Sequence, residues 1–194
     1  MDPDPPCPIL FLAGGDTALK VAVESGVRPL NWLLSAGRYW GGGVFRGFEN
    51  DVALVRRLGG ILFIDSGAQQ FYSKFHGLVY PYTVSQYLDL ALRIGANLVA
   101  TLDLPLDILT PRGLSVERGI QLTAELGAEV VATAEKLGIE DRVVPVLQGY
   151  DDPSQWLENL DLYKEHGITP AKFKLWAETL DCSFLCQIVS FYAS

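Results

Sequence analysis

Three polar side chains each stand where a short apolar run of the sequence ends. The segments 60–65, 98–103 and 143–148 finish in Asp65, Asp103 and Gln148. A carboxylate can accept paired hydrogen bonds or transfer a proton, and an amide can both donate and accept. Each aspartate could instead cap the turn or helix that follows it, which is a frequent role of this residue type. The threefold repetition favours one shared site over separate caps.

These segments belong to a series of apolar runs that alternate with segments of helical periodicity. The runs are continuously apolar, as is typical of parallel strands buried on both faces. Strand–helix alternation predicts an α/β fold of parallel βαβ units. The predicted strands cover residues 9–13, 32–35, 60–65, 98–103, 143–148 and 173–176.

The segments between the strands carry recognisable helix ends. Thr83 and Gln86 have the spacing of a capping box, in which each side chain satisfies the other's backbone N–H. Asp152 is a predicted N-cap, and Pro153 takes the first helical position. The predicted helices, with their caps, cover residues 49–58, 83–95, 115–137 and 152–167. Gly127 is a candidate break in the longest of them.

The order of elements predicts an incomplete (β/α)8 TIM-barrel type of fold with about six β/α units. In such barrels the C-terminal strand ends line the active site, which suits the three polar residues. A doubly wound dinucleotide fold does not fit, because residues 13–15 lack the GxGxxG spacing and the glycines 41–43 follow no strand directly. We expect a single domain over residues 1–194, with an N-terminal arm (1–7) and a divergent tail (177–194).

Composition narrows the class of protein. The net charge of −8 argues against a broad electrostatic surface for nucleic acid, although Arg38, Arg46, Arg56, Arg57 and Lys74 could form a local basic strip or lie scattered. No apolar run is long enough for a membrane helix, and the N-terminus lacks signal-peptide features, so we expect a cytoplasmic protein without membrane partners. The three cysteines make no disulfide framework, and we expect no metal site.

Three segments resemble motifs of the tRNA-guanine transglycosylase superfamily, including its relatives that modify DNA. Residues 65–71 (DSGAQQF) resemble the family's DSGG-aromatic-Gln segment, and residues 95–103 (GANLVATLD) resemble its GAD-type strand. Residues 146–149 (VLQG) resemble its VQGG turn, and residues 8–14 and 31–35 fit its first two strands. The resemblance spans roughly residues 8 to 176. It implies a (β/α)8 barrel that replaces guanine in a nucleic acid with a 7-deazaguanine.

The resemblance also implies roles for individual residues. Asp65 matches an active-site acid that can act as general acid and base, and Asp103 matches the residue that recognises the amidine-like edge of the purine. Gln148 and Gly149 match the turn that binds the base carbonyl. The remaining residues of the implied substrate-binding set are Ser66 and Gly67, in the loop that approaches the ribose, and Gln70.

The sequence departs from the family pattern in three places. Gln69 stands where the family has a base-stacking aromatic residue, for which Phe71 or Tyr72 could substitute. The family's nucleophilic aspartate lies on an eighth strand and its zinc site lies further on, and neither has a match here. We therefore expect a truncated chain without cofactor, which needs the missing segment, in cis or as a partner, to complete the exchange.

These observations leave three functions open. The leading one is a base-exchange transglycosylase acting on tRNA or DNA, with a slight preference for DNA because of Gln69. The second is a non-catalytic fragment that binds a purine or a partner subunit and forms homo- or hetero-oligomers through its unpaired sheet edges. The third is an unrelated barrel enzyme that uses Asp65 and Asp103 as a carboxylate pair for hydrolysis.

Overall fold

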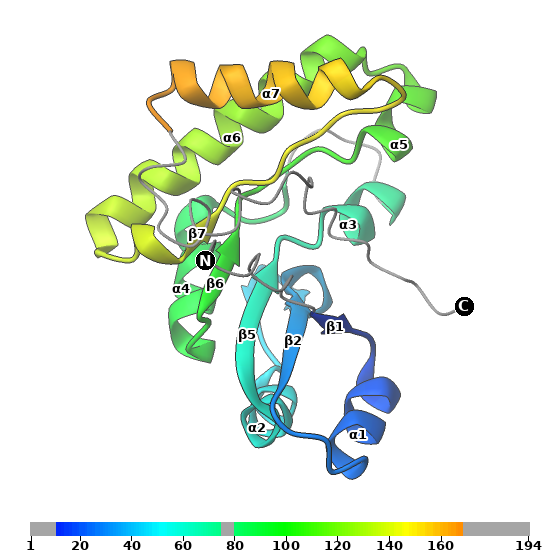
Figure 1. Ribbon diagram of the computed structural model, residues 1–194, viewed down its shortest axis with the longest axis vertical. Helices are drawn as coiled ribbons and strands as arrows, with labels where there is room; N and C mark the ends of the chain where they lie inside the picture. Colours follow the sequence, from blue (N-terminus) through cyan, green and yellow to red (C-terminus); the bar gives the residue numbers. More distant parts are fainter. Residues whose placement is uncertain (1–10, 75–79, 169–194) are drawn as a thin grey trace, which may run out of the picture.

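A five-stranded parallel sheet forms the centre of the fold (Figure 1). The computed structural model describes residues 11–74 and 80–168. The sheet order is β1-β2-β5-β6-β7, so strands that follow one another along the chain are neighbours. A doubly wound sheet would show a reversal of this order, and the described strands show none. The strands are β1 (Leu12–Ala13), β2 (Leu30–Ser35), β5 (Gly59–Asp65), β6 (Leu98–Ala100) and β7 (Val143–Val144).

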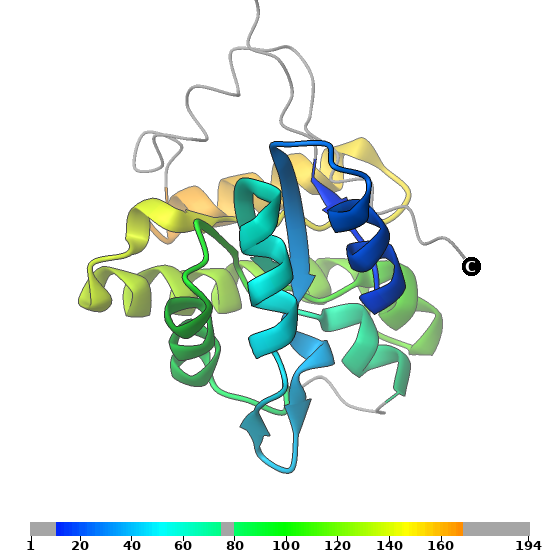
Figure 2. The same cartoon turned by 90° about the horizontal axis from the view of Figure 1, so that it is seen from below.

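Long helices connect these strands and pack against one face of the sheet, and one more, α7, follows the last described strand. The buried core on that face contains side chains from the sheet and from α1, α2, α4 and α6, among them Trp32, Ile64 and Val99. Figure 2 shows α1, α2 and α4 side by side along this face. Arg93 of α4 lies over the ring of Phe48 at the start of α2, 4.9 Å from its centroid. The helices are α1 (Asp16–Glu24), α2 (Glu49–Leu58), α4 (Val84–Ile94), α6 (Val116–Leu137) and α7 (Pro153–Glu165).

The other face of the sheet carries a separate and smaller apolar cluster. Its buried members are Phe63, Leu98 and Ala100, against which half-buried residues such as Leu33 and Val144 pack. Alternate residues of each strand therefore belong to different clusters, as the pleat of a strand requires. Both faces are apolar, which explains why the strands are continuously apolar in sequence.

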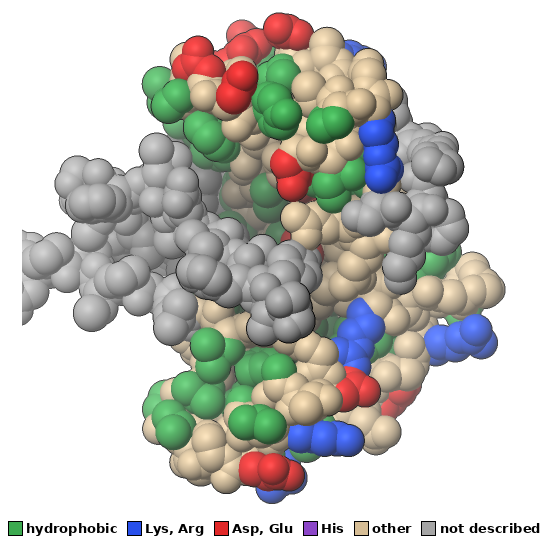
Figure 3. Space-filling model, turned by 90° about the vertical axis from the view of Figure 1, so that its right-hand side faces the viewer, with side chains coloured by type: hydrophobic (Ala, Val, Ile, Leu, Met, Phe, Trp, Pro, Cys, Tyr) green, Lys and Arg blue, Asp and Glu red, His purple; other side chains and the backbone are tan. Residues whose placement is uncertain are grey.

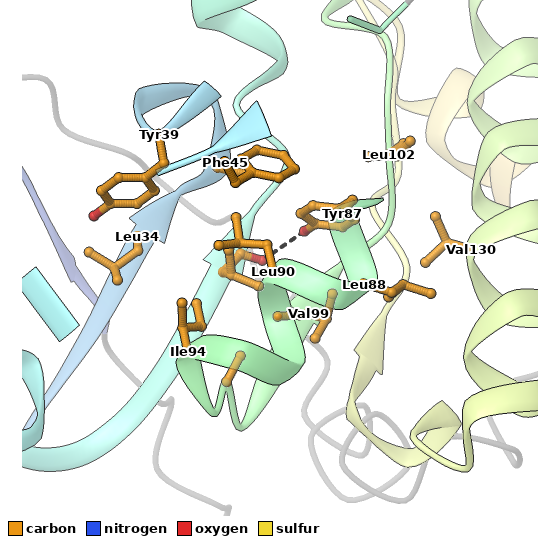
Figure 4. Packing of buried hydrophobic residues seen from close by; sticks show 14 of the residues in the cluster. Leu34, Tyr39, Phe45, Tyr87, Leu88, Leu90, Ile94, Val99, Leu102 and Val130 are labelled. Carbon is orange, nitrogen blue, oxygen red and sulfur yellow. Dashed lines mark hydrogen bonds between the residues drawn. The ribbon is translucent and has the colours of Figure 1, made fainter. Parts of the chain in front are cut away.

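Helix α4 is tied to the sheet by a hydroxyl group as well as by apolar packing. The Tyr87 hydroxyl lies 3.1 Å from the carbonyl oxygen of Ile64 and 3.0 Å from that of Ala100, on neighbouring strands β5 and β6. Around it, Leu88, Val99 and Val130 fill the space between α4, the sheet and α6 (Figure 4). The buried tyrosine thus bridges the strands that carry Asp65 and Asp103.

The predicted helix starts are confirmed. Thr83 Oγ1 accepts from the backbone N–H of Gln86, and Gln86 Oε1 accepts from the N–H of Thr83, which is the reciprocal capping box. Asp152 accepts from the N–H of Ser154 at 2.9 Å and caps α7. The expected break near Gly127 is wrong, since α6 runs unbroken from Val116 to Leu137. A glycine is needed there because a Cβ atom would collide with the ring of Tyr163.

Two strands are shorter than predicted. Segment 98–103 is a strand only over Leu98–Ala100, and segment 143–148 only over Val143–Val144, with one further backbone bond from the N–H of Thr101 to the carbonyl oxygen of Val144 at 2.9 Å. Pro145 has no N–H to donate, so it interrupts the regular ladder. The Thr101 hydroxyl takes over by accepting from the N–H of Val146 at 2.8 Å. Of segment 9–13, the structure forms a strand over Leu12–Ala13, while residues 9–10, and all of 1–7, 173–176 and 177–194, lie outside the described residues.

Several short elements were not predicted. A hairpin of β3 (Trp40–Gly41) and β4 (Val44–Phe45) follows β2, and the glycine run 41–43 forms its turn, with φ of 62° and 80° at Gly42 and Gly43. Short helices α3 (Ala68–Lys74) and α5 (Leu106–Leu109) follow the carboxyl ends of β5 and β6. Single 3-10 turns cover Ala36–Arg38, Thr110–Arg112 and Glu140–Arg142. Within the described part of the chain, no helix is long and apolar enough to cross a membrane.

Candidate functional site

Asp103 is the centre of a polar cluster at the carboxyl end of the sheet. Its Oδ1 accepts a 2.9 Å hydrogen bond from the Ser66 hydroxyl, and its Oδ2 accepts a 2.6 Å bond from Nε2 of Gln148. The carboxyl group is 7% exposed and Ser66 is fully buried. Each carboxylate oxygen is thus held by a side chain from a different direction.

The strand order explains this convergence. Ser66 directly follows β5, Asp103 follows β6, and Gln148 follows β7, while β6 lies between the other two strands. Because parallel strands end at the same edge of a sheet, residues 37 and 45 positions apart in sequence meet there. The prediction that the polar ends of strands 98–103 and 143–148 meet is confirmed.

Tyr80 fixes the backbone of Asp103. Its hydroxyl donates to the carbonyl oxygen of Asp103 at 2.7 Å and accepts from the N–H of the same residue at 3.1 Å. The hydroxyl also lies 3.1 Å from Oγ of Ser66. Tyr82 donates to the carbonyl oxygen of Ser66. These two tyrosines replace the ladder bonds that end with β5 and β6.

Asp65 takes a different position from Asp103. It is half-buried at the last position of β5, and its Oδ2 accepts a 3.0 Å bond from the N–H of Gly67. The side chain therefore caps its own turn, which was the simpler of the two roles considered from the sequence. Burial nevertheless raises the pKa of Asp65, with backbone hydrogen bonds from Gly67 and Ser66 opposing the shift.

The electrostatics of the site favour a carboxyl group that changes charge near neutral pH. Burial raises the pKa of Asp103 to about 7, and the negative charge of Asp65 contributes to the shift. Hydrogen bonds from Ser66, Gln148 and Tyr80 act in the opposite direction, because they stabilise the carboxylate. Such tuning is typical of functional sites, although structural networks also produce it.

Helix α7 holds the segment that carries Gln148. Asn159, which is fully buried, accepts from the backbone N–H of Gln148 at 2.9 Å and donates to the carbonyl oxygen of Ile120 at 3.0 Å. The Tyr163 hydroxyl donates to the carbonyl oxygen of Val146 at 3.1 Å. Among the described residues, segment 145–149 pairs with no strand, and these side chains hold it in place.

The three remaining predicted site residues flank the cluster. Gly67 has a φ of 78° and approaches Gly37 so closely that a Cβ at either position would meet the other residue's backbone. The Gln70 side chain lies against Gly37, and its Oε1 is 2.5 Å from where a Cβ atom of residue 37 would stand. It therefore faces the end of β2. Gly149 lies against the ring of Trp156, which is 2.7 Å from where a Cβ atom of residue 149 would stand. No hydrogen bond joins Gln70 or Gly149 to Asp103 among the interactions of the described residues.

The proposed substitutes for the stacking residue Gln69 belong to an aromatic cluster. Phe71 packs against Tyr80 and Tyr82, with ring centroids 6.2 and 5.4 Å apart. Tyr72 packs edge-on against Tyr80 at 5.6 Å. Both rings are therefore buried in the protein core.

Among the basic residues considered for a local strip, Arg38 is engaged in ion pairs. Arg38 is paired with Asp16 and, at 3.3 Å, with Asp51. On the face shown in Figure 3, Lys and Arg side chains lie apart from one another and are interspersed with Asp and Glu. Within residues 11–74 and 80–168, no group of three or more His, Cys, Asp or Glu side chains could hold a metal ion, and the three cysteines lie outside these ranges.

Comparisons with known proteins give no independent assignment. No family pattern, no characterised protein and no solved structure matches the chain.

Sequence reasoning missed the residues that support the site. Tyr80, Tyr82, Asn159 and Tyr163 bond mainly to backbone atoms of the site segments, and Tyr80 also contacts Oγ of Ser66. The sequence offered one signal, the pair of tyrosines around Pro81 directly before the capping box, which indicates a rigid connector. Asn159 and Tyr163 stand four residues apart, on one face of α7, but nothing in the sequence indicates what that face contacts.

Proposed function

We propose that the Asp103 site binds the amidine-like edge of guanine or a 7-deazaguanine, as part of a base-exchange transglycosylase acting on tRNA or DNA. The observation that carries this proposal is the convergence of Ser66 and Gln148, from the strands on either side, on the two oxygens of Asp103. A carboxylate held in this way has a fixed plane, which paired hydrogen bonding to a flat base requires. The replaced and the inserted base share this edge, so one carboxylate can serve both.

The sheet supports the corresponding barrel architecture. Parallel strands in sequential order, with long helices packed on one face, are the arrangement of a (β/α)8 barrel. The second apolar cluster, around Phe63, Leu98 and Ala100, would then face the interior. Asp103 and Gln148 stand at the carboxyl end of the strands, where barrel enzymes have their sites.

In this reaction Asp65 is the candidate proton carrier. The leaving guanine has to gain a proton and the incoming base has to lose one. Burial brings the pKa of Asp65 closer to neutral pH than the pKa of an exposed aspartate. The hydrogen bond from the Gly67 N–H to Oδ2 fixes the position of this carboxyl group.

A non-catalytic purine-binding or partner-binding role is the second candidate. It is favoured by the bonding of Asp65, which is that of a turn cap and would serve no chemical step. Under this alternative the chain binds the base but performs no exchange.

Calorimetric titration with guanine and 7-deazaguanine, with adenine as the control, tests the shared part of both functions. Adenine lacks the two adjacent donors that Asp103 would accept, so only the first two bases should bind. Radiolabelled guanine exchange, measured separately into tRNA and DNA, then distinguishes the two. Binding without exchange, even with the family's later strands supplied in trans, favours the second candidate. Equal or absent binding of all three bases overturns both the exchange function and the purine-binding role.

A further inference from the structure

The hydroxyl group of Tyr72 is buried beside the site without a hydrogen-bond partner among the described residues. Tyr72 lies on α3, the short helix after β5, and is 2% exposed. A buried hydroxyl normally finds a partner, because leaving it unsatisfied costs about 1–3 kcal/mol. Such a group calls for a specific explanation.

Tyr72 is held in place at its ring and at its backbone. Its ring meets the ring of Tyr80 edge-on at 5.6 Å, and Tyr80 in turn bonds to Asp103. Arg112, from the 3-10 turn after α5, donates to the carbonyl oxygen of Tyr72. Burial, and then the charge of Asp103, raise the pKa of Tyr72, so the hydroxyl keeps its proton. The group is a preorganised donor close enough to Asp103 to feel its charge.

Tyr72 and Gln148 come from opposite sides of Asp103 in the strand order of the sheet. Tyr72 follows β5 and Gln148 follows β7, while Asp103 follows the strand between them. Nε2 of Gln148 donates one of its two N–H groups to Asp103, and its second N–H can donate to a ligand. Across the carboxyl end of the sheet, the protein therefore presents a donor, a carboxylate acceptor and a second donor.

We propose that the Tyr72 hydroxyl is a specificity-determining group that donates a hydrogen bond to N3 of the bound base. This inference rests on the proposed function. The edge of guanine reads, in order, a carbonyl oxygen, two N–H donors and the N3 acceptor. If Gln148 meets the carbonyl and Asp103 meets the two donors, the next position along the edge is N3, on the side of Tyr72.

The test compares guanine with 3-deazaguanine, which replaces N3 by a C–H group and keeps the rest of the edge. Calorimetry on the wild-type chain should show guanine binding about fivefold to tenfold more tightly, the value of one neutral hydrogen bond. In Tyr72→Phe this preference should disappear, because guanine binding weakens while 3-deazaguanine binding stays the same. The melting temperature of the free Tyr72→Phe protein should not fall, since the hydroxyl has no partner to lose.

Tyr39→Phe is the matched control, because it also removes a buried hydroxyl, one that bonds to Asp51 at 2.8 Å. It should lower the melting temperature and leave the preference for guanine over 3-deazaguanine unchanged. An undiminished preference in Tyr72→Phe overturns the inference while the proposed function stands. A lowered melting temperature of Tyr72→Phe also overturns it, because the hydroxyl would then have a structural partner such as an internal water. If wild type binds neither base, the proposed function itself fails.

Discussion

Gln148 and Asp103 are joined by a 2.6 Å hydrogen bond between the side-chain amide and Oδ2 of the carboxyl group. The two residues lie 45 positions apart and belong to the ends of adjacent parallel strands. The Ser66 hydroxyl holds Oδ1 from the opposite strand. This arrangement makes Asp103 an acceptor on both oxygens, and the first two predictions depend on it.

Asp103→Asn should weaken the binding of guanine and 7-deazaguanine by roughly a hundredfold, which corresponds to about 2–3 kcal/mol. The new amide presents N–H groups to a neighbourhood that already contains the donors Ser66 and Gln148. It also leaves one N–H of the base without an acceptor. Calorimetry measures the loss, and Asp141→Asn, at an exposed 3-10 position, is the control for a change of charge alone. Equal affinities for wild type and Asp103→Asn would remove Asp103 from the site.

The same carboxyl group should make the stability of the fold depend on pH. Its pKa is about 7 in the folded chain, against about 4 in an unfolded one. Between these values the folded state holds a proton that the unfolded state has lost, so the free energy of unfolding should fall as pH rises from about 4 to 7. Asp103→Asn should flatten this slope.

Urea denaturation at pH 4.5, 5.5, 6.5 and 7.5 measures the effect as the difference between wild type and Asp103→Asn. The difference is needed because the raised pKa of Asp65 acts in the same direction. Parallel curves for the two proteins would show that Asp103 ionises normally in the fold.

Sequence patterns predicted the elements whose signals are local. The capping box at Thr83 and the N-cap at Asp152 depend on residues two or three positions apart, and both are present. The continuously apolar runs predicted parallel strands, because both faces of the sheet are covered by apolar neighbours. The meeting of Asp103 with Gln148 followed from the common polarity of parallel strands.

The features that the sequence did not predict depend on tertiary contacts, which sequence periodicity does not reveal. Gly127 is a candidate break on sequence alone because glycine weakens helices, whereas in the structure the packing of Tyr163 requires a glycine at this position. The length of segment 143–148 was overestimated because Pro145 stops the ladder and a side chain, Thr101, continues the pairing. The tyrosines that bond to the strand ends were missed since their hydroxyl partners are backbone atoms distant in sequence.

Gly127→Ala should destabilise the chain by about 1–3 kcal/mol, the usual cost of overpacking a core. In an unobstructed helix the same change would stabilise by up to about 1 kcal/mol. At this position, however, the added methyl group meets the ring of Tyr163. Urea denaturation in a Tyr163→Leu background is the control, because the ring is then absent and the substitution should become neutral or favourable. Destabilisation of the same size in both backgrounds would contradict this account of Gly127.

Asn159→Leu should weaken base binding although Asn159 is linked to Asp103 only through Gln148. The substitution leaves the N–H of Gln148 and the carbonyl of Ile120 without partners, at about 1–3 kcal/mol for each unsatisfied buried group. The segment that carries Gln148 should then shift, and the 2.6 Å bond to Asp103 should lengthen or break. We expect a lower free energy of unfolding together with severalfold weaker guanine binding, measured by denaturation and calorimetry below the unfolding transition.

Gln155→Leu is the matched control, because Gln155 accepts from the N–H of Tyr150 in the same loop but at an exposed position. It should change both quantities little. If Asn159→Leu lowers stability and leaves the affinity for guanine intact, Asn159 supports the fold alone and Gln148 finds its position without it.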